Sequence, residues 1–264
     1  MLKVCTLFSG SSANSTLIQV DGRAILIDAG GGVLKTGKAL QQAGTDFSKL
    51  DAIFITHEHS DHVSGLATIL KRHRIPVIGN TATLKKMLFE HPELDDSLFC
   101  EMPTGSTAVK DGFEVTSFAA PHDSVECVGY KIKTKYGCVG VTTDAGQPTS
   151  EIFTKLSGCG ILVLEANHDR KMLLEGPYPY MLKQRIAGPS GHLSNEQSGE
   201  LLSKLVESGA KKVLLAHLSK ENNTPDIALS TVGMCLSESG ITVQKDVLVS
   251  VAPRDCVSDI YIAE

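Results

Sequence analysis

The sequence lacks the features of membrane-spanning and exported proteins. No stretch approaches the roughly 18 consecutive apolar residues that a membrane helix needs. The opening segment, Met1–Gly10, is too short and too polar to be the apolar core of a signal peptide. We therefore expect a cytoplasmic protein that does not enter a membrane.

Paired cysteines and an excess of positive charge are also missing. The seven cysteines include no Cys-x-x-Cys pair, which favours free thiols in a reducing compartment. The formal net charge is −5, from 25 Lys and Arg against 30 Asp and Glu. No global positive field attracts nucleic acid or anionic lipid, so a phosphate-bearing substrate requires local cations.

What is present is the composition of an ordinary folded protein. The chain has 264 residues, of which 42% are apolar and 21% are charged. These values exclude disordered and fibrous architectures. We find no internal repeat and no low-complexity linker, so we predict a single domain that spans residues 1–264.

Apolar runs and turn residues alternate along the chain in a way that predicts an α/β (α+β) fold, with mixed sheets flanked by helices. The expected strands are 2–8, 16–20, 24–27, 52–55, 75–78, 113–118, 128–134, 138–143, 161–164 and 213–216. The expected helices are 34–43, a helix that follows residue 62 and ends near 70, 81–90, 194–207 and 225–239. Ser194 and Gln197 have the spacing of a capping box.

The segment His57-Glu-His-Ser-Asp-His62 directly follows an expected strand. Side chains at the end of a strand are commonly functional in α/β proteins. His57 and His59 alternate and can point to one metal ion, while Asp61 and His62 lie one turn farther on and can reach a second. Three histidines and an aspartate in six residues therefore predict a metal site.

This His-x-His-x-Asp-His pattern resembles the signature of the metallo-β-lactamase fold. Three later residues match the remaining ligand positions of that family in the expected order: His122 in Ala-Ala-Pro-His-Asp, Asp144 in Val-Thr-Thr-Asp-Ala-Gly, and His217 in Leu-Leu-Ala-His-Leu-Ser. The resemblance implies a four-layer αβ/βα sandwich whose active site lies at one end of two sheets.

The resemblance also implies a ligand set for two divalent metal ions. One ion would be held by His57, His59 and His122, and the second by Asp61, His62 and His217, with Asp144 bridging both. Imidazole and carboxylate ligands without cysteine suit zinc, manganese or iron, so the ligand types do not select the metal.

Two further elements resemble the phosphodiesterase branch of this family, which includes ribonuclease Z. They are Leu-Glu-Ala-Asn-His-Asp around Glu165 and Ser-Gly-His-Leu-Ser around His192. The resemblance implies that His192 acts on the scissile phosphate with Glu165 as its acidic partner. A helix-capping Gly-His turn is the alternative explanation of His192.

Longer strings resemble the bacterial YycJ/WalJ subgroup. They are Ser-Gly-Ser-Ser-Ala-Asn-Ser from position 9, Gly-Pro-Tyr-Pro-Tyr from 176 and His-Leu-Ser-Lys-Glu-Asn-Asn-Thr-Pro from 217. That subgroup is associated with metal-dependent exonuclease activity on DNA. Only about 70 residues separate Asp144 from His217, which leaves no room for the large insertion of the RNase J-like enzymes.

Candidate substrate contacts come from two segments. Ser11 and Asn14 lie in the 9–15 loop, which could contact phosphate or could simply be a hairpin turn. The basic segment 168–190 offers the remaining candidates, which are His168, Tyr178, Tyr180, Lys183 and Arg185. Cations beside aromatic rings can hold a single strand through phosphate contacts and base stacking. A solvated lid explains the same composition.

These observations favour a dinuclear metal-dependent phosphodiesterase that acts as a DNA exonuclease, with DNA favoured over RNA as its partner. Water with a pKa lowered by two cations would attack phosphorus, oriented by Asp61 and Asp144. His192 would neutralise the developing charge or protonate the leaving oxygen. The alternatives are a hydrolase of a small substrate, such as a thioester or a cyclic phosphodiester, and a non-catalytic metal-binding regulator. The sequence does not indicate the oligomeric state.

Overall fold

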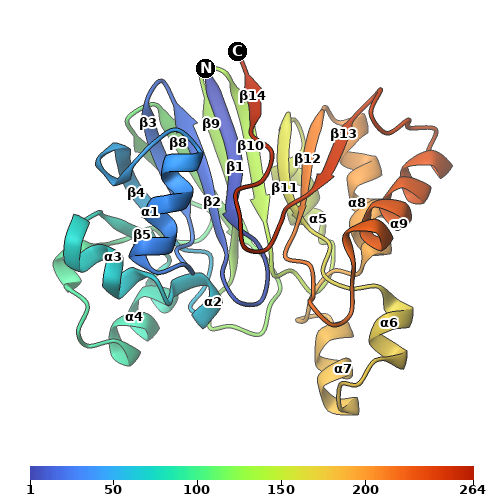
Figure 1. Cartoon of the computed structure of the whole chain (residues 1–264), viewed down its shortest axis with the longest axis horizontal. Helices are drawn as coiled ribbons and strands as arrows, with labels where there is room; N and C mark the ends of the chain where they lie inside the picture. The colour runs from blue at the N-terminus through green and yellow to red at the C-terminus, as the bar shows by residue number, and fades with distance from the viewer.

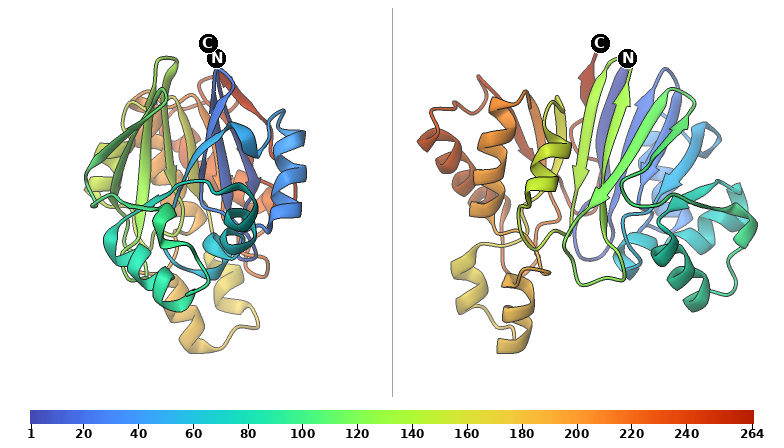
Figure 2. Two further views of the ribbon diagram at one scale, coloured as in Figure 1. Left: turned by 90° about the vertical axis from the view of Figure 1, so that its left-hand side faces the viewer. Right: turned by 180° about the vertical axis from the view of Figure 1, so that it is seen from behind.

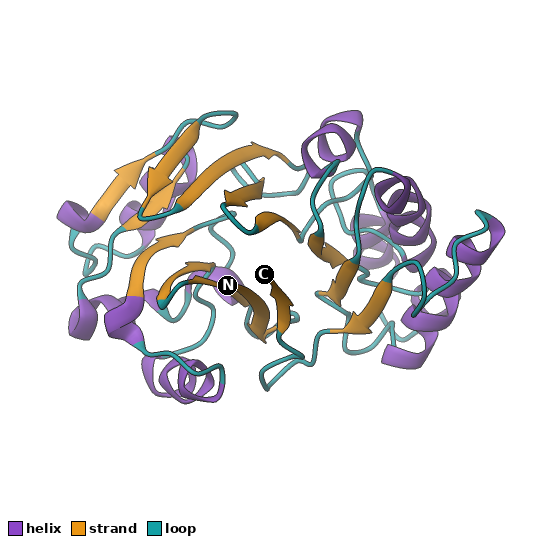
Figure 3. Cartoon of the chain, turned by 90° about the horizontal axis from the view of Figure 1, so that it is seen from above, coloured by secondary structure: helices purple, strands orange, loops and turns teal.

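Strands and helices alternate along the chain because apolar β runs are separated by amphipathic segments, and they assemble into four layers (Figures 1 and 3). The computed structural model describes all residues from 1 to 264. Two seven-stranded sheets pack face to face, and helices cover the outer face of each sheet. The predicted αβ/βα sandwich is confirmed.

The first sheet has the strand order β14-β1-β2-β3-β4-β5-β6. Its strands are β1 (Leu2–Phe8), β2 (Ser15–Val20), β3 (Arg23–Ile27), β4 (Leu50–Phe54), β5 (Val77–Gly79), β6 (Phe99–Glu101) and β14 (Tyr261–Ala263). Strands β1 to β3 pair antiparallel, as the turn residues between them predict, whereas β3 to β6 pair in parallel.

The second sheet has the order β13-β12-β11-β10-β9-β8-β7 and the same division into antiparallel and parallel parts. Its strands are β7 (Thr107–Lys110), β8 (Phe113–Ala119), β9 (Val128–Thr134), β10 (Gly137–Thr142), β11 (Ile161–Glu165), β12 (Lys212–Ala216) and β13 (Leu248–Val251). The carboxyl ends of β10, β11 and β12 therefore meet at one edge.

Helices α1 (Val33–Gln42), α3 (Leu66–His73) and α4 (Thr81–Glu90) pack on the first sheet, and α5 (Ser150–Leu156), α8 (Asn195–Glu207) and α9 (Pro225–Glu238) pack on the second. Helix α2 (Ser60–Val63), helices α6 (Arg170–Glu175) and α7 (Tyr180–Ala187), and the 3-10 turns η1 (Phe47–Lys49) and η2 (Asp96–Leu98) complete the set. No helix combines the length and apolar character that a bilayer crossing requires.

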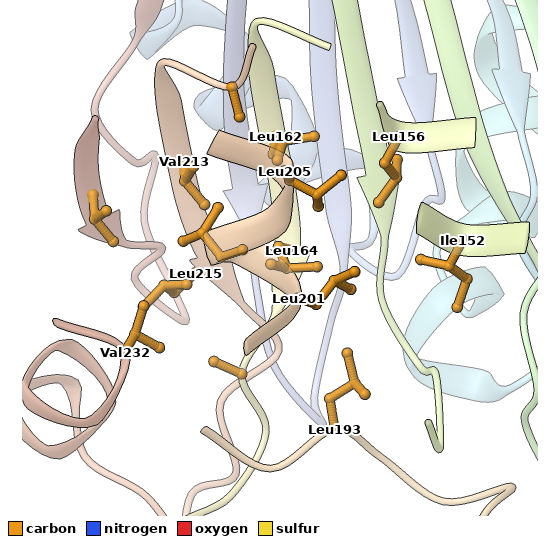
Figure 4. Packing of buried hydrophobic residues seen from close by; sticks show 14 of the residues in the cluster. Ile152, Leu156, Leu162, Leu164, Leu193, Leu201, Leu205, Val213, Leu215 and Val232 are labelled. Carbon is orange, nitrogen blue, oxygen red and sulfur yellow. The ribbon is translucent and has the colours of Figure 1, made fainter. Parts of the chain in front are cut away.

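Three buried clusters hold the layers together. One lies between the two sheets and includes Ile18, Phe54, Tyr130 and Leu214. The Tyr130 hydroxyl donates to the Ile55 carbonyl (2.5 Å), so this fully buried tyrosine leaves no polar atom unpaired. The other two clusters lie beneath the helices; Figure 4 shows leucine and valine side chains of β11, β12, α8 and α9 interlocked on the second sheet. Burial of this extent stabilises the sandwich by about 25 cal/mol per Å² of apolar surface removed from water.

Most expected elements are confirmed within one or two residues. The expected helix 81–90 matches α4, and the capping box at Ser194 is formed, with Gln197 closing it. The helix expected after residue 62 is found as α3, which ends three residues later than expected and is separated at Gly65 from the short helix α2. At Gly65 the backbone crowds Gly31, leaving no space for a side chain, and its amide donates to the Ala29 carbonyl.

Candidate metal centre

The predicted ligands gather at one end of the two sheets because each follows a strand that points there. His57 follows β4, His122 follows β8, Asp144 follows β10 and His217 follows β12. Helix α2 carries Asp61 and His62, and lies at the same end of the molecule (Figure 1).

His57, His59 and His122 form one group. The ring centroids of His57 and His59 lie 4.6 Å apart, and the His122 ring lies 5.0 Å and 5.1 Å from them. One ring nitrogen from each residue lies within 4.8 Å of the others. This spacing suits three ligands of one cation.

Asp61, His62 and His217 form a second group, again with ligand atoms within 4.8 Å of one another. The Asp61 Oδ2 atom lies 3.3 Å from His62 Nε2 and 3.5 Å from His217 Nε2. Asp144 stands between the groups: its Oδ2 lies 3.1 Å from His62 Nε2, and its Oδ1 lies 3.7 Å from His122 Nε2.

Buried polar atoms without partners test whether cations fit here. The Nε2 atoms of His57 and His217 and the Oδ2 atom of Asp144 are buried and make no hydrogen bond. Such groups are costly to bury unless another partner satisfies them. Because all three belong to the predicted ligand set, the residues present fit divalent cations.

Neighbouring side chains fix the orientation of the ligand rings. The Asp28 Oδ2 atom accepts from Nδ1 of His62 (2.7 Å) and from the Thr56 hydroxyl, which also contacts Nδ1 of His57 (3.0 Å). Nδ1 of His122 lies 2.9 Å from the Gly191 carbonyl. These contacts leave the Nε2 atoms facing the site and support the metal-ligand assignment.

His192 and Glu165 form a pair beside this centre. Nδ1 of His192 lies 2.8 Å from Glu165 Oε1, and the same oxygen lies 3.0 Å from His217 Nδ1. The backbone amides of Ala145 and Leu193 donate to the other carboxylate oxygen. The four groups of Asp144, Glu165, His192 and His217 also lie within 4.8 Å of one another. Geometry alone therefore allows His192 to be a base, an acid or a further ligand.

Burial and nearby carboxylates shift the histidine pKa values in opposite directions. Burial holds the pKa of His57 well below its usual value. Burial also lowers the pKa of His62 and His217, but the surrounding carboxylates, Asp144 foremost, outweigh it: the pKa of His62 is raised well above its usual value and that of His217 to about 10. Cations that bind these nitrogens have to displace protons from them.

The backbone at the strand ends adopts an uncommon conformation. Asp28, Asp144 and His217 have φ values of 63°, 59° and 56°, in the left-handed region. Aspartate and histidine enter this region more often than most residues, but at a cost. All three turns aim their side chains into the same cluster.

A cavity of about 220 Å³ opens over the cluster. Among its lining residues are five predicted ligands or partners, which are His59, Asp61, His122, Asp144 and His217, together with His192. The predicted substrate residues Ser11, Tyr178 and Arg185 also line it.

The other predicted substrate residues lie elsewhere. Asn14 is buried beneath the cavity, where its amide donates to Asp61 Oδ2 (2.9 Å). His168 is buried with an unpartnered Nδ1, and burial lowers its pKa to about 4. Tyr180 is 70% exposed outside the cavity, and the Lys183 ammonium donates to the Leu174 carbonyl (2.7 Å).

Comparison with known proteins identifies the family. Residues 23–218 match the family model described as the β-lactamase superfamily domain. The chain belongs to the β-lactamase superfamily. It is 31% identical over 250 residues to exodeoxyribonuclease YycJ of Bacillus anthracis, covering 92% of each chain. It is 32% identical over 246 residues to exodeoxyribonuclease WalJ of Streptococcus pneumoniae, covering 92% of this chain and 91% of that one.

A solved superfamily structure supports the fold. The metallo-β-lactamase fold protein YhfI of Bacillus subtilis superimposes with a TM-score of 0.70 at 17% identity, covering 97% of this chain and 98% of that one. The predicted YycJ/WalJ resemblance is confirmed at the level of relatives. The chain is a hydrolase of the β-lactamase superfamily, with a histidine and aspartate cluster compatible with divalent metal ions.

Sequence reasoning missed Asp28 and Thr56, which contact the predicted ligands His57 and His62. Asp28 follows strand β3 and precedes Ala-Gly-Gly-Gly. An acidic residue between a buried strand and a glycine run is the signal that could have found it. Nothing comparable marks Thr56, which is one residue before the ligand motif.

Proposed function

We propose that this hydrolase is a dinuclear metal-dependent phosphodiesterase that acts as a DNA exonuclease. The observation that carries the proposal is one cavity where Asp61, Asp144 and His217 line the wall beside His192, held by Glu165. The names of two relatives that cover nine-tenths of the chain support DNA as the substrate.

The predicted ligands would hold the cations in two sets. His57, His59 and His122 form the first, Asp61, His62 and His217 the second, and Asp144 faces both. When bound, two such cations lower the pKa of water and neutralise charge that develops on a phosphate. Zinc, manganese and iron all suit these ligands.

The chain's own groups would position the reactants. Asp61, oriented by the Asn14 amide, presents a carboxylate to the attacking water. Glu165 engages Nδ1 of His192 and leaves Nε2 available for a substrate oxygen. Because His192 lines the cavity, Nε2 can donate a proton to the leaving oxygen of the scissile ester.

End-labelled oligonucleotides test the proposal directly. We expect metal-loaded protein to shorten single- or double-stranded DNA progressively from one end, and to act more slowly on RNA of the same sequence. A thioester and bis-p-nitrophenyl phosphate serve as small-substrate controls. The proposal would be overturned if the protein hydrolysed the thioester but left DNA uncut. It would also be overturned if fully metal-loaded protein hydrolysed none of these substrates.

A further inference from the structure

Two cations that the sequence analysis did not select lie beside the cavity. Ser11 and Ser219 line the cavity wall, and Lys220 follows Ser219 on the surface. The Arg254 guanidinium donates to the Ser219 carbonyl (2.7 Å). We call Ser11, Ser12, Ser219, Lys220 and Arg254 the serine rim.

Arg254 joins the two loops that form this rim. Its backbone carbonyl accepts from the Ser9 amide (3.2 Å), while its side chain packs against Gly10 and bonds to Ser219. On the inner side of the same loops, the Ser9 hydroxyl accepts from the His217 amide (2.8 Å). Ser9 therefore links Arg254 to the predicted metal ligand His217, because it bonds to the backbone of both residues.

The two rim cations have no carboxylate partner, whereas two cations of the predicted basic segment do. Arg185 pairs with Asp123, Arg170 lies 3.6 Å from Glu196, and Lys183 bonds to a carbonyl. Neither Lys220 nor Arg254 forms an ion pair with a carboxylate.

Two acidic residues lie near the rim cations. Asp255, the carboxylate whose pKa is lowered by Lys35, Arg254 and Lys220, is already paired with Lys35 (2.8 Å). Glu221 is exposed beside Lys220 and reduces the local positive charge without removing it. Lys220 and Arg254 therefore supply positive charge beside the part of the cavity wall that Ser219 forms.

Backbone N–H groups beside these cations are also available to bind an anion. The amides of Ser11 and Ser12 make no hydrogen bond within the protein, although the neighbouring Ala13 amide closes the turn onto the Gly10 carbonyl. Unpaired successive amides next to cations are a typical environment for a phosphate oxygen.

We propose that the serine rim binds the backbone phosphates of a single DNA strand next to the scissile phosphate, with Lys220 and Arg254 as its cations. This inference rests on the proposed nuclease function and adds the path of the strand across the surface. A small phosphodiester ends at the metal centre and does not reach the rim.

The test compares two charge reversals that change the net charge equally. Lys220→Glu acts at the rim, and Lys204→Glu acts at an exposed, unpaired lysine of α8 on the outer face of the second sheet. Binding of a fluorescent single-stranded phosphorothioate 20-mer is measured by anisotropy at several salt concentrations. Hydrolysis of unmodified DNA and of bis-p-nitrophenyl phosphate is measured in parallel.

We expect Lys220→Glu to weaken strand binding about threefold or more and to reduce the slope of log K against log salt by about 0.7–1. Lys204→Glu should bind the strand like the wild type. Lys220→Arg, which keeps the positive charge, should also bind it with wild-type affinity. Arg254→Gln should weaken binding while the small ester is still hydrolysed. If Arg254→Gln loses both strand binding and hydrolysis of the small ester, Arg254 only holds the two loops together, and its proposed role in binding phosphate is wrong.

Equal binding by Lys220→Glu and Lys204→Glu would overturn the rim, even if the wild type digests DNA. Conversely, if the wild type binds the strand through Lys220 but does not cleave DNA, the proposed nuclease function is wrong and strand binding by the serine rim still holds. If the wild type binds no single strand, both proposals are wrong.

Discussion

Asp28 shows how one buried carboxylate orients two predicted ligands. It accepts from His62 Nδ1 and from Thr56, which in turn contacts His57. Both rings therefore keep the tautomer that presents Nε2 to the centre.

Replacing Asp28 should affect metal affinity more than folding. We expect Asp28→Asn to weaken metal binding roughly 10–100-fold, because the ring of His62 loses its charged partner. Competition with a chromophoric chelator measures the affinity, and circular dichroism confirms the fold. Asp46→Asn, at an exposed 3-10 turn, is the matched control. Unchanged affinity in Asp28→Asn would contradict the assigned contact.

Asp144 should control the metal count, because it is the carboxylate that faces both ligand groups. Elemental analysis of reconstituted wild type should give about two ions per chain, as a two-metal site requires. Asp144→Ala should lower this number and abolish turnover. Asp226→Ala, at the exposed start of α9, should change neither quantity. Full metal content in Asp144→Ala would remove it from the ligand set.

His192 could donate a proton to the leaving oxygen or act as a further metal ligand, and the two roles predict different results for the same substitution. If it acts on the leaving oxygen, His192→Ala should lower the rate roughly 10²–10⁴-fold with the metal content retained. Parallel rate and elemental measurements separate the two roles. Loss of an ion from His192→Ala would instead support the group it forms with Asp144, Glu165 and His217.

The sequence could predict the residues that the structure brings together, because they form a short motif and then recur after strands that a pattern of apolar residues reveals. Asn14 was predicted as a surface contact for substrate, and in the structure its buried amide donates to Asp61. The side chain that binds His62 comes from β3, and only the pairing of β3 with β4 brings it there. Linear spacing carries no information about that pairing.

At the scale of elements, the arm formed by α6 and α7 is the least integrated part of the structure. It projects from the sandwich at the end that holds the metal centre (Figure 2). Helix α7 has no buried residue. Tyr178 and Arg185 nevertheless line the cavity, and Arg185 pairs with Asp123 next to the ligand His122.

Tyr178 and Tyr180 were both predicted as substrate contacts, but only Tyr178 lines the cavity. Tyr178→Ala should weaken binding of a single-stranded end by about 1–3 kcal/mol, the contribution of one base stack. Tyr180→Ala should have a smaller effect, because that ring lies outside the cavity. Anisotropy with a single-stranded oligonucleotide measures both. Equal affinities for both variants and the wild type would make the arm a lid without strand contacts.

Helices α5, α6 and α7 were not predicted, and neither were β6, β7, β13 and β14. These elements are short, and the half-exposed strand β7 has little apolar patterning. Helix α5 is visible mainly through its Thr149 cap, which accepts from the Ile152 amide. Long elements with a continuous apolar face, such as α8, were found because burial and periodicity agree in them.

At the scale of the whole molecule, we propose that residues 1–264 fold as one domain. The cluster between the sheets takes side chains from both halves of the chain, such as Ile18 and Leu214. The predicted ligands are divided in the same way, with His57 and His217 on different sheets. Metal binding should therefore stabilise the entire sandwich.

Chelation provides the measurement. With free metal at 1,000 times Kd, binding stabilises the folded state by about 4 kcal/mol. Each kcal/mol shifts Tm by roughly 2–4 °C in a protein of this size. Adding a strong chelator should thus lower Tm by about 8–16 °C, and Asp144→Ala should show a smaller decrease. A Tm that does not respond to chelation in the wild type would show that the cations bind without structural coupling.

The pairing of β1 with β14 also sets the order in which the chain can fold. Leu2 pairs with Ala263 and Val4 with Tyr261, so β1 has to wait for β14, which the ribosome makes more than 250 residues later. At about 5–20 residues per second, that edge of the sheet stays unpaired for roughly 13–50 s of synthesis. An open apolar edge invites pairing with other nascent chains. Lys3, the partly exposed charged residue near the start of β1, is placed to discourage such pairing until β14 has been made.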